Sequence, residues 1–277
     1  MKYIIVQAGG KGRRMEILTR NKPKALVPVQ NLPMIFHLFR LFKGAKFIIV
    51  GDYKFDVLER YLRAFGSNEA DYELVRATGF TGTCAGLKQA LQFIPPAERF
   101  MFIWCDLLLP DKFTMPDSCE NLLGISKDFS CRWSYVDGGF AEQSSKEHGV
   151  AGFFVFKDKE LLLDAPDNGE FVRWLQGQHI PFKELPLTGA KEYGLYQEWL
   201  KLPRMRCRPF NAMEIEGDRV TKRGIDNQGI QLGKREVAWY DAMQGLEFKN
   251  MPKIYSTNPL CMELIDGKNI YEYTYVN

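Results

Sequence analysis

Short apolar runs alternate with segments of helical periodicity over the first 110 residues, and this order constrains the fold more than any other feature. Residues 33–43, 55–65 and 82–94 place apolar side chains at helical spacing. The runs between and around them have the length and the β-branched or aromatic content of buried strands. Strands that alternate with helices predict βαβ units, and so an α/β protein with a mostly parallel sheet. The strand-like runs are "KYIIV", "KFIIVG", "YELVRA" and "RFMFIWCDLLL".

The pattern changes twice further along the chain. Residues 130–156 contain two strand-like runs, "CRWSYVDGG" and "GVAGFFVF", followed by short helical segments at 169–178 and 192–202. The run "PRMRCRP" at 203–209 encloses arginines between prolines and predicts a domain boundary, with one domain over residues 1–202 and a smaller one over 203–277. The second region predicts a hairpin turning at Gly217-Asp218, a helix in "KREVAWYDAMQG" ended by glycine, and strands in "PKIYS" and "LCMELIDGKNI".

Composition excludes several classes of protein. The net charge is only +3, from 37 basic and 34 acidic residues, so the chain as a whole is not built to bind a polyanion. Six cysteines form no C-x-x-C pair, and the three histidines form no H-E-x-x-H, which argues against a zinc site. Cys84 and Cys105 lie in apolar runs and are expected to be core residues. No signal peptide or membrane-spanning run is recognisable, so we expect a cytoplasmic protein without a membrane partner.

The loop after the first strand is rich in glycine and basic residues. Within "VQAGGKGRRMEILTRNKPKALVPV", Lys11, Arg13 and Arg14 would face an anion, with Lys22 and Lys24 arriving from the same loop. Such a loop lies at the edge where α/β proteins bind ligands, and its glycines let backbone N–H groups approach phosphates. It lacks the Gly-Lys-Ser/Thr ending of a Walker A motif and the third glycine of a dinucleotide fingerprint. The alternative is a solvated basic loop that contacts nucleic acid together with Arg204–Arg208, which the near-neutral total charge disfavours.

The longer stretch "AGGKGRRMEILTRNKPKALVPVQNLPMI" resembles the signature of the sugar-phosphate and phosphocholine nucleotidyltransferases, A-G-G-x-G-x-R-M/L, L-T, P-K-A-L-x-P-V and P-M-I. The resemblance implies a Rossmann-like, three-layer αβα domain of the GT-A-like type, with a small α+β unit after it. It also implies transfer of a nucleoside monophosphate from an NTP, with CTP or UTP favoured, to a phosphorylated small molecule. The acceptor would be a phosphocholine-like amino alcohol phosphate or a sugar 1-phosphate, pyrophosphate would leave, and the product would serve surface glycan or capsule synthesis.

The same resemblance assigns site residues. Arg13 and Lys24 would contact the phosphates, and Asp106 in "FIWCDLL" would bind Mg²⁺. In "AKEYGLYQEWL", Glu192 aligns with a second metal-binding aspartate, although Leu195 departs from the family pattern. The residues expected to hold the nucleotide are Ala8, Gly9, Gly10, Lys11 and Gly12, with Gly82 and Thr83 of "TGTCAGL" near the base or ribose.

Each assignment has a structural alternative. Thr83 is also a favoured helix cap, Asp106 could cap a turn, and Glu192 could be an exposed acid at a helix start. Gly152 would lie beneath the substrate in the family, or it would allow close packing. Lys146 in "SSKEHG" is a poor candidate for the acceptor phosphate, because the family's E-K-P motif is absent. Six aromatic residues would either form a cage for a quaternary ammonium or belong to the core: Trp133, Tyr135, Phe153, Phe154, Tyr193 and Trp199.

The last 75 residues resemble the N-lobe of a choline-kinase or aminoglycoside-phosphotransferase-like kinase. Lys222 in "DRVTKR" would be the ATP-binding lysine and Glu236 its partner on the following helix. No catalytic loop or metal-binding motif of a kinase follows, so we expect no kinase activity from this region alone. The alternative is that the chain is a fragment of a bifunctional kinase whose N-terminal part binds nucleotide. An apolar face left where a second lobe would dock would favour a homodimer.

Overall fold

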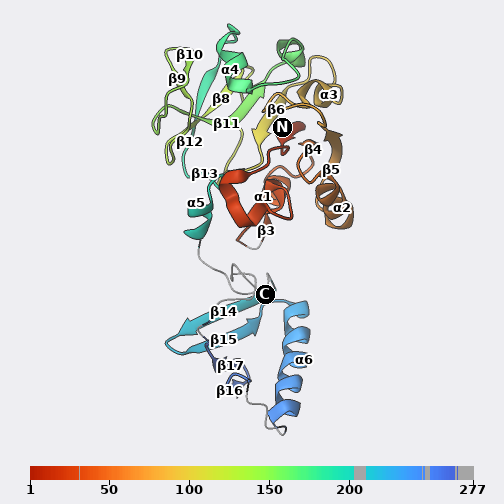
Figure 1. The fold of residues 1–277 in the computed structure, drawn as a ribbon, viewed down its shortest axis with the longest axis vertical. Coiled ribbons are helices and arrows are strands. Elements are labelled where there is room, and N and C mark those ends of the chain that lie inside the picture. Colours follow the sequence, from red (N-terminus) through yellow and green to blue (C-terminus); the bar gives the residue numbers. More distant parts are fainter. Residues whose placement is uncertain (31, 203–209, 245, 247–249, 266, 268–277) are drawn as a thin grey trace. The chain divides into compact units, whose positions relative to one another are not determined.

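The computed structural model describes residues 1–30, 32–202, 210–244, 246, 250–265 and 267. The chain divides into two compact units, Met1–Leu202 and Pro203–Asn277, which are drawn in Figure 1. The arginines at 204–208, Cys207, the glycine at 245 and most of the end of "LCMELIDGKNI" lie outside the described residues.

The first unit contains short helices around one large sheet (Figure 1). Its helices are α1 (Met34–Leu41), α2 (Phe55–Phe65), α3 (Leu87–Leu91), α4 (Phe171–Gln176) and α5 (Tyr196–Leu200), with 3-10 turns η1 (Arg13–Thr19), η2 (Lys24–Leu26) and η3 (Lys159–Leu162). Its strands are β1 (Tyr3–Gln7), β2 (Pro28–Val29), β3 (Leu32–Pro33), β4 (Lys46–Gly51), β5 (Asp71–Arg76), β6 (Phe100–Trp104), β7 (Leu107–Leu108), β8 (Leu122–Ser126), β9 (Ser134–Val136), β10 (Gly139–Ala141), β11 (Gly149–Phe156), β12 (Lys183–Leu187) and β13 (Lys191–Glu192).

The nine-stranded sheet is mostly parallel in strand direction, as the alternation of strands and helices predicts. Its main path is β10-β9-β11-β6-β1-β4-β5, with β8 pairing β11 and β12 pairing β8. The ladders β6-β1, β1-β4, β4-β5 and β8-β12 are parallel, and only β11 and β10 run against the other strands. The sequence analysis missed β8 and β12, because "NLLGIS" contains glycine and serine and "KELPL" contains proline.

Side chains alternate along the central strands between two cores, one on each face of the sheet. Ile4 of β1 faces the core formed with α1 and α2, whereas its neighbour Ile5 faces the core formed with α3 and α4. The same alternation separates Phe102 from Ile103 in β6, and all four side chains are fully buried. A sheet with a packed helical layer on each face is the predicted three-layer αβα architecture.

The helix predicted over residues 82–94 is much shorter than expected, because α3 covers only Leu87–Leu91. Gly82 and Gly86 have φ values of +85° and +76°, which are left-handed and end any right-handed helix at these positions. A Cβ on Gly86 would lie 2.5 Å from Cγ1 of Val50, so the loop also packs closely on β4. The glycines therefore make residues 82–86 a loop at the edge of the sheet, where the helical pattern alone indicated a helix.

The second unit is an antiparallel sheet with one helix. Its elements are β14 (Asn211–Glu216), β15 (Arg219–Gly224), α6 (Asn227–Gln244), β16 (Ile254–Thr257) and β17 (Leu260–Glu263), in the sheet order β14-β15-β17-β16. The hairpin turns at Gly217-Asp218, as predicted. Helix α6 begins earlier than predicted, because Oδ1 of Asp226 accepts a hydrogen bond from N of Gly229 at 2.7 Å and caps it.

Two further predictions of the sequence analysis concern the thiols and membrane spans. Cys84, Cys105 and Cys131 are buried, and burial raises the pKa of Cys105 to about 12, so its thiol is inert packing as expected. Across the part of the chain that the structure describes, no helix has the length and apolar character needed to span a membrane.

Candidate active site

The glycine loop that follows β1 is shaped to receive an anion. Gly12 has φ +60°, and a Cβ there would lie 2.9 Å from Cγ2 of Thr19 and 3.4 Å from Cβ of Lys24, so the loop packs against the lysine segment. Gly10 has open space where a side chain would lie. Among the described residues, the N–H groups of Gly10, Lys11 and Gly12 have no acceptor. Unpaired backbone donors beside basic side chains form a site for phosphate oxygens.

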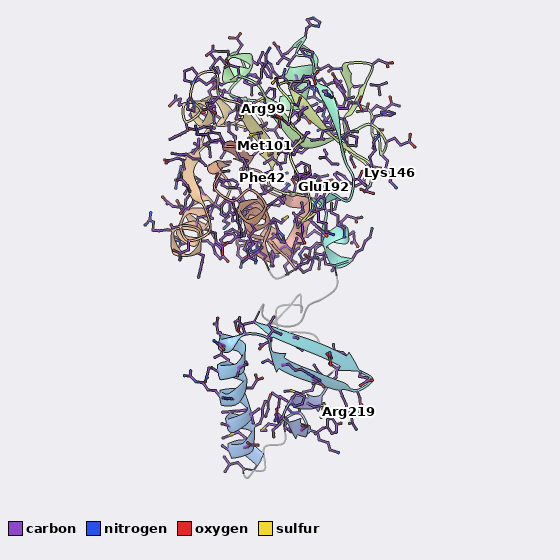
Figure 2. The ribbon with its side chains drawn as sticks, turned by 180° about the vertical axis from the view of Figure 1, so that it is seen from behind. Phe42, Arg99, Met101, Lys146, Glu192 and Arg219 are labelled. Carbon is purple, nitrogen blue, oxygen red and sulfur yellow. The ribbon has the colours of Figure 1, made fainter. Side chains whose placement is uncertain are left out.

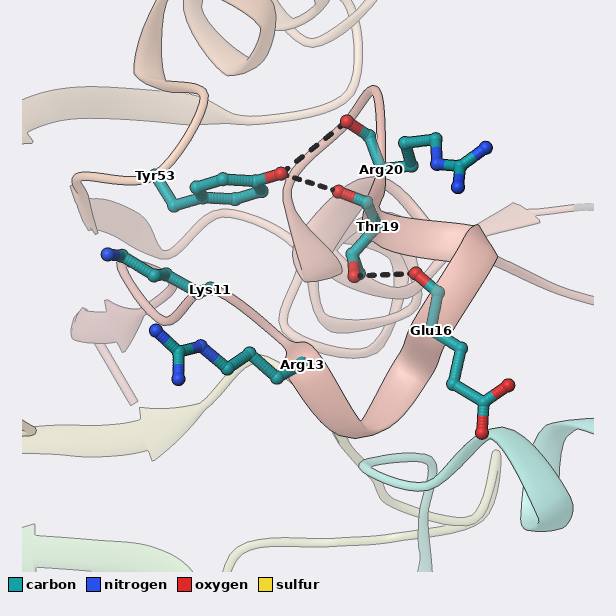
Figure 3. A pocket seen from close by; sticks show the side chains of 6 residues that line it. All are labelled: Lys11, Arg13, Glu16, Thr19, Arg20 and Tyr53. Atoms are coloured by element: carbon teal, nitrogen blue, oxygen red, sulfur yellow. Dashed lines mark hydrogen bonds between the residues drawn. The ribbon is translucent and has the colours of Figure 1, made fainter.

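A cavity of about 310 Å³ opens beside this loop (Figure 3). Thr19 lines the cavity and holds the glycine loop in place, because its hydroxyl donates to the carbonyl of Gly12 at 3.0 Å. Tyr53 Oη donates to the carbonyls of Thr19 and Arg20, at 2.9 Å and 3.5 Å. Lys11 and Arg13 extend in the same direction, while the carboxylate of Glu16 points the other way (Figure 3). The lining residues are Lys11, Arg13, Glu16, Thr19, Arg20 and Tyr53; the predicted Arg14, Lys22 and Lys24 are not among them.

Lys24 and Asp106 form a close ion pair at the carboxyl edge of the sheet. Nζ of Lys24 lies 2.5 Å from Oδ2 of Asp106, and the two side chains are 17% and 6% exposed. Burial is the largest single effect and lowers the pKa of Lys24, but the charge of Asp106 and the hydrogen bond to it, together with Cys105 and Glu192, outweigh burial and leave the pKa raised. Asp106 lies two residues after the end of β6, where α/β proteins place catalytic groups, and the alternative of a simple turn cap does not account for its ion pair with Lys24.

Glu192 joins this pair through a small sheet that the sequence does not predict. Strand β13 pairs antiparallel with β7, which sets Glu192 opposite Leu107, and N of Tyr193 donates to the carbonyl of Asp106 at 3.0 Å. Oε1 of Glu192 also lies 3.9 Å from Nη2 of Arg14. The alternative of an exposed acid at a helix start is wrong, because Glu192 is in a strand and α5 begins at Tyr196.

The two carboxylates converge on Gly194. A Cβ on Gly194 would lie 2.2 Å from Oε1 of Glu192 and 2.9 Å from Oδ2 of Asp106. Burial, followed by the negative charge of Asp106, raises the pKa of Glu192 to about 7 against the opposing charges of Lys24 and Arg14. Carboxylate oxygens meeting at one point are suitable ligands for a hard cation. In the described residues no group of three or more His, Cys, Asp and Glu side chains gathers in this way, so a cation would need further oxygens from a ligand or water.

Thr83 has a different structural role from the helix cap considered in the sequence analysis. Its hydroxyl accepts a hydrogen bond from N of Phe171 at 2.7 Å, so it caps α4 from a distant part of the chain and does not cap α3. Gly82, beside it, packs against Gly169 so closely that a Cβ would lie 2.2 Å from the Gly169 carbonyl oxygen. The predicted nucleotide residues Gly82 and Thr83 therefore lie in a tightly packed loop.

The predicted acceptor features do not assemble into a cage. Trp133, Tyr135 and Phe154 belong to one buried cluster, Phe153 to another, and Tyr193 and Trp199 to a third. The core alternative is therefore correct for five of these aromatic residues, Trp199 packs against the third cluster while partly buried, and the cage alternative is wrong.

Gly152 and Lys146 also differ in what surrounds them. Gly152 has φ +76°, and a Cβ there would lie 2.1 Å from the ring of Trp104, which supports the packing alternative. Lys146 is exposed in the loop after β10 and lies at the margin of the first unit, whereas Glu192 lies inside it (Figure 2).

Comparison with known proteins shows which proteins the first unit resembles. Residues 4–132 match the family described as MobA-like NTP transferase domain. HddC from Yersinia pseudotuberculosis has a similar structure, with a TM-score of 0.60 at 21% identity over 73% of this chain and 98% of that one. So does the CTP:phosphocholine cytidylyltransferase LicC from Streptococcus pneumoniae, with a TM-score of 0.56 at 18% identity over 75% of this chain and 100% of that one.

The inositol-1-phosphate CTP transferase from T. maritima is a third structure of this kind, with a TM-score of 0.57 at 18% identity over 74% of this chain and 97% of that one. A search of curated proteins found no match to the sequence. The family match ends at residue 132, and neither it nor these structures supports the kinase-lobe resemblance of residues 203–277. Residues 4–132 are similar to the MobA-like NTP transferase domain, and the chain is an enzyme of the nucleotidyltransferase class.

Proposed function

We propose that the first unit transfers a nucleoside monophosphate from an NTP, CTP or UTP in the first place, to the phosphate of a small molecule and releases pyrophosphate. The observation that carries the proposal is the meeting of Lys24, Asp106 and Glu192 directly beside the glycine loop. A basic loop alone would suit any anion. A buried lysine between that loop and a pair of carboxylates suits a reaction in which charge moves between phosphate groups.

The reaction requires positioning and charge neutralisation, without a covalent enzyme intermediate. An oxygen of the acceptor phosphate attacks the α-phosphorus of the NTP, and the bond to the bridging oxygen of pyrophosphate breaks. In this proposal the N–H groups of Gly10, Lys11 and Gly12 bind the triphosphate, together with Ala8 and Gly9 of the same loop. Arg13 and Lys24 stabilise the negative charge that develops on the leaving pyrophosphate. Lys24 needs no proton transfer for this role, because its raised pKa keeps it charged.

Mg²⁺ fits the donor set at Asp106 and Glu192. Two carboxylate oxygens facing one point are hard ligands, and Mg²⁺ is usually bound by one or two carboxylates with substrate phosphates and water completing the shell. When bound, the ion would neutralise phosphate charge. The contribution of the chain is to hold both carboxylates at this point, through the pairing of β13 with β7 and the absence of a side chain at Gly194.

The acceptor and the base are the finer part of the proposal. Two of the structural neighbours are described as a CTP:phosphocholine cytidylyltransferase and an inositol-1-phosphate CTP transferase, which supports CTP with an alcohol phosphate as the first pair to test. We propose an activated precursor of a surface glycan or capsule as the product and the cytoplasm as its place of synthesis. Because the aromatic residues are core, recognition of a choline group would need other side chains.

The test is pyrophosphate release measured with Mg²⁺ over an array of donors and acceptors. The donors are CTP, UTP, GTP, ATP and dTTP, and the acceptors are phosphocholine, other phosphorylated amino alcohols, inositol 1-phosphate and sugar 1-phosphates. Release with one pair, lost in Lys24→Ala, supports the proposal. Absence of release from every pair, together with absence of NTP binding in thermal-shift assays, would contradict it.

Gly194→Ala is expected to lower turnover about tenfold or more while leaving the protein folded. The new methyl group would occupy the point where the carboxylates of Glu192 and Asp106 converge, so at least one of them must move. The measurement is turnover as a function of Mg²⁺ concentration, and we expect a higher Mg²⁺ requirement than in the wild type. Gly189→Ala is unsuitable as a control because of its φ of +80°, whereas Gly177→Ala, at φ −84°, should behave as the wild type. Unchanged Mg²⁺ dependence in Gly194→Ala would contradict the metal assignment.

A second candidate function concerns residues 203–277. The predicted pair of Lys222 and Glu236 is present as an ion pair between β15 and α6, which is the observation that favours a kinase-like lobe. We propose that this unit has no phosphotransfer activity alone and that it is retained for packing, including contact between two copies of the chain. The check is [γ-³²P]ATP transfer to choline or ethanolamine, where labelled product from the purified chain would contradict it.

A further inference from the structure

Gln7, the last residue of β1, uses its side-chain amide entirely inside the protein. Nε2 donates to the carbonyl of Thr83 at 2.8 Å and to that of Ala85 at 3.1 Å, while Oε1 accepts from N of Gly9 at 3.3 Å. The residue is 8% exposed. One buried amide therefore connects the glycine loop to the loop formed by residues 81–85. Because both N–H donors are committed, Gln7 is not available to read a nucleotide base.

A second amide holds the same loop from a different segment. Oδ1 of Asn168 accepts from N of Thr81 at 2.8 Å and from its hydroxyl at 3.3 Å. Asn168 belongs to the loop before α4, far from Gln7 in the sequence. The two amides thus hold opposite ends of the loop, at Thr81 and at Thr83 to Ala85.

The backbone of the same two segments is joined as well. N of Gly169 donates to the carbonyl of Thr81 at 2.9 Å, and N of Cys84 donates to the carbonyl of Gly169 at 3.0 Å. Gly82 and Gly169 both have positive φ values, +85° and +108°, and only glycine at position 82 permits their close approach. Without the amide of Asn168, the N–H group of Thr81 would lose its acceptor, and Thr81 is the first residue that these backbone hydrogen bonds join to Gly169.

We propose that Gln7 and Asn168 are positioning residues that fix loop 81–85 for the nucleoside half of the NTP, Gln7 by joining it to the glycine loop and Asn168 by joining it to α4. This inference rests on the proposed function and on the expectation, carried by the family resemblance, that Gly82 and Thr83 lie beside the base or ribose. A loop that is fixed before binding loses little conformational entropy when the nucleotide binds. More of the free energy of its contacts with the nucleotide therefore contributes to affinity. Gln7 and Asn168, which we call the amide clamp, affect binding of the nucleoside. The pyrophosphate portion of the NTP would instead bind at the glycine loop and the basic cavity.

The experiment compares Asn168→Ala with Asn168→Asp, which keeps an oxygen acceptor for Thr81. Asp167→Ala is the matched control, since the side chain of Asp167 is 43% exposed and its only described charge partner is Lys88 at 3.9 Å. Gln7→Glu replaces the two donors by an oxygen facing the carbonyls of Thr83 and Ala85. The readouts are kcat and KM for the NTP that the array selects, calorimetric binding of that NTP and of pyrophosphate, and hydrogen exchange of residues 79–86.

Asn168→Ala is expected to raise the KM and Kd for the NTP about five- to tenfold, the effect of losing one or two hydrogen bonds. Pyrophosphate binding should stay unchanged, and exchange at the amides of Thr81 and Cys84 should become faster. Asn168→Asp should recover NTP binding to within about twofold, and Gln7→Glu should weaken it more than Asn168→Ala does. Asp167→Ala should match the wild type.

Equal loss in Asn168→Ala and Asn168→Asp, or a parallel loss of pyrophosphate binding, would overturn the amide clamp and leave the proposed function intact. Faster exchange in residues 79–86 with unchanged NTP binding would show that the loop does not serve the nucleoside, which also overturns it. A wild-type protein that binds no NTP and releases no pyrophosphate would instead remove the proposed function, and the positioning role with it. If Gln7→Glu does not fold, the Asn168 pair alone decides the result.

Discussion

Asp106→Asn is expected to lower the rate of pyrophosphate release by about 10²-fold or more, the scale seen when one electrostatic stabiliser of a transition state is removed. Asparagine has nearly the same shape as aspartate, so the change removes the charge and leaves the packing around β6 in place. The loss should appear in kcat, because the carboxylate acts on the reacting phosphates, with a smaller effect on the KM for the NTP. The measurement is steady-state pyrophosphate release at saturating Mg²⁺.

The matched experiment separates catalysis from charge pairing. Asp106→Asn leaves the Lys24 charge buried beside a neutral amide, so the free energy of unfolding should fall by about 3–5 kcal/mol. Lys24→Met alone leaves Asp106 beside Glu192 without its main cation and should also destabilise the protein. The double variant Lys24→Met with Asp106→Asn should recover stability relative to the single variants but recover no activity. Activity within threefold of the wild type in Asp106→Asn would reject a catalytic role for this carboxylate.

Gly152→Ala is expected to reduce the free energy of unfolding by about 3–5 kcal/mol. Its backbone has φ +76°, which an alanine adopts only with strain, and the methyl group would lie 2.1 Å from a carbon of the Trp104 ring. Trp104 is partly buried, and its ring packs against Phe154 beside the core on the α3 and α4 face of the sheet, so Phe154 blocks its retreat in that direction. The measurement is urea unfolding followed by tryptophan fluorescence.

Gly177→Ala is the control for this measurement as well. Gly177 follows α4 with φ −84°, and the contact of a new Cβ with the carbonyl oxygen of Trp174, at 3.5 Å, is ordinary. It should change stability by less than about 1 kcal/mol, as surface substitutions generally do. Gly152→Ala with the stability of this control would show that the close packing of Gly152 on Trp104 is not a constraint.

The local elements of the first unit are predictable because each carries its own periodic pattern. The run "KFIIVG" becomes β4 (Lys46–Gly51) and "FDVLERYLRAF" becomes α2 (Phe55–Phe65), both with the bounds expected from the sequence. Lys24, Asp106 and Glu192 are predicted as site residues, and the structure brings them together. Their family roles remain predictions.

Non-local partners are what the sequence does not provide. The bond from Phe171 to the hydroxyl of Thr83 joins residues 88 positions apart, and no local pattern indicates it. The same holds for Arg14 beside Glu192 and for Gly194, where only the pairing of β13 with β7 makes a glycine necessary. Gln7 offered one signal that was not fully used, since a polar residue that closes a buried apolar strand must find internal partners.

The aromatic residues illustrate the limit of composition. Phe153 and Phe154 are adjacent in β11, yet they face opposite sides of the sheet and enter different cores. Strand periodicity determines which face each residue takes, and a cage needs several rings on the same face. A cluster of aromatic letters therefore did not predict a cluster of rings.

The reversed direction of β11 has a consequence for how this enzyme can diversify. Because β11 runs against β6, the loop that leads into it arrives at the same edge of the sheet as the carboxyl ends of β1 and β6. The parallel strands β1, β4 and β5 carry the glycine loop without depending on the length of that incoming loop. Residues 142–148, which join β10 to β11, can therefore lengthen at less cost to the strands beneath than the strands themselves could, as surface loops generally do. Under the proposed function, this segment is a place where the chain can vary while the glycine loop that would bind the NTP is inherited unchanged.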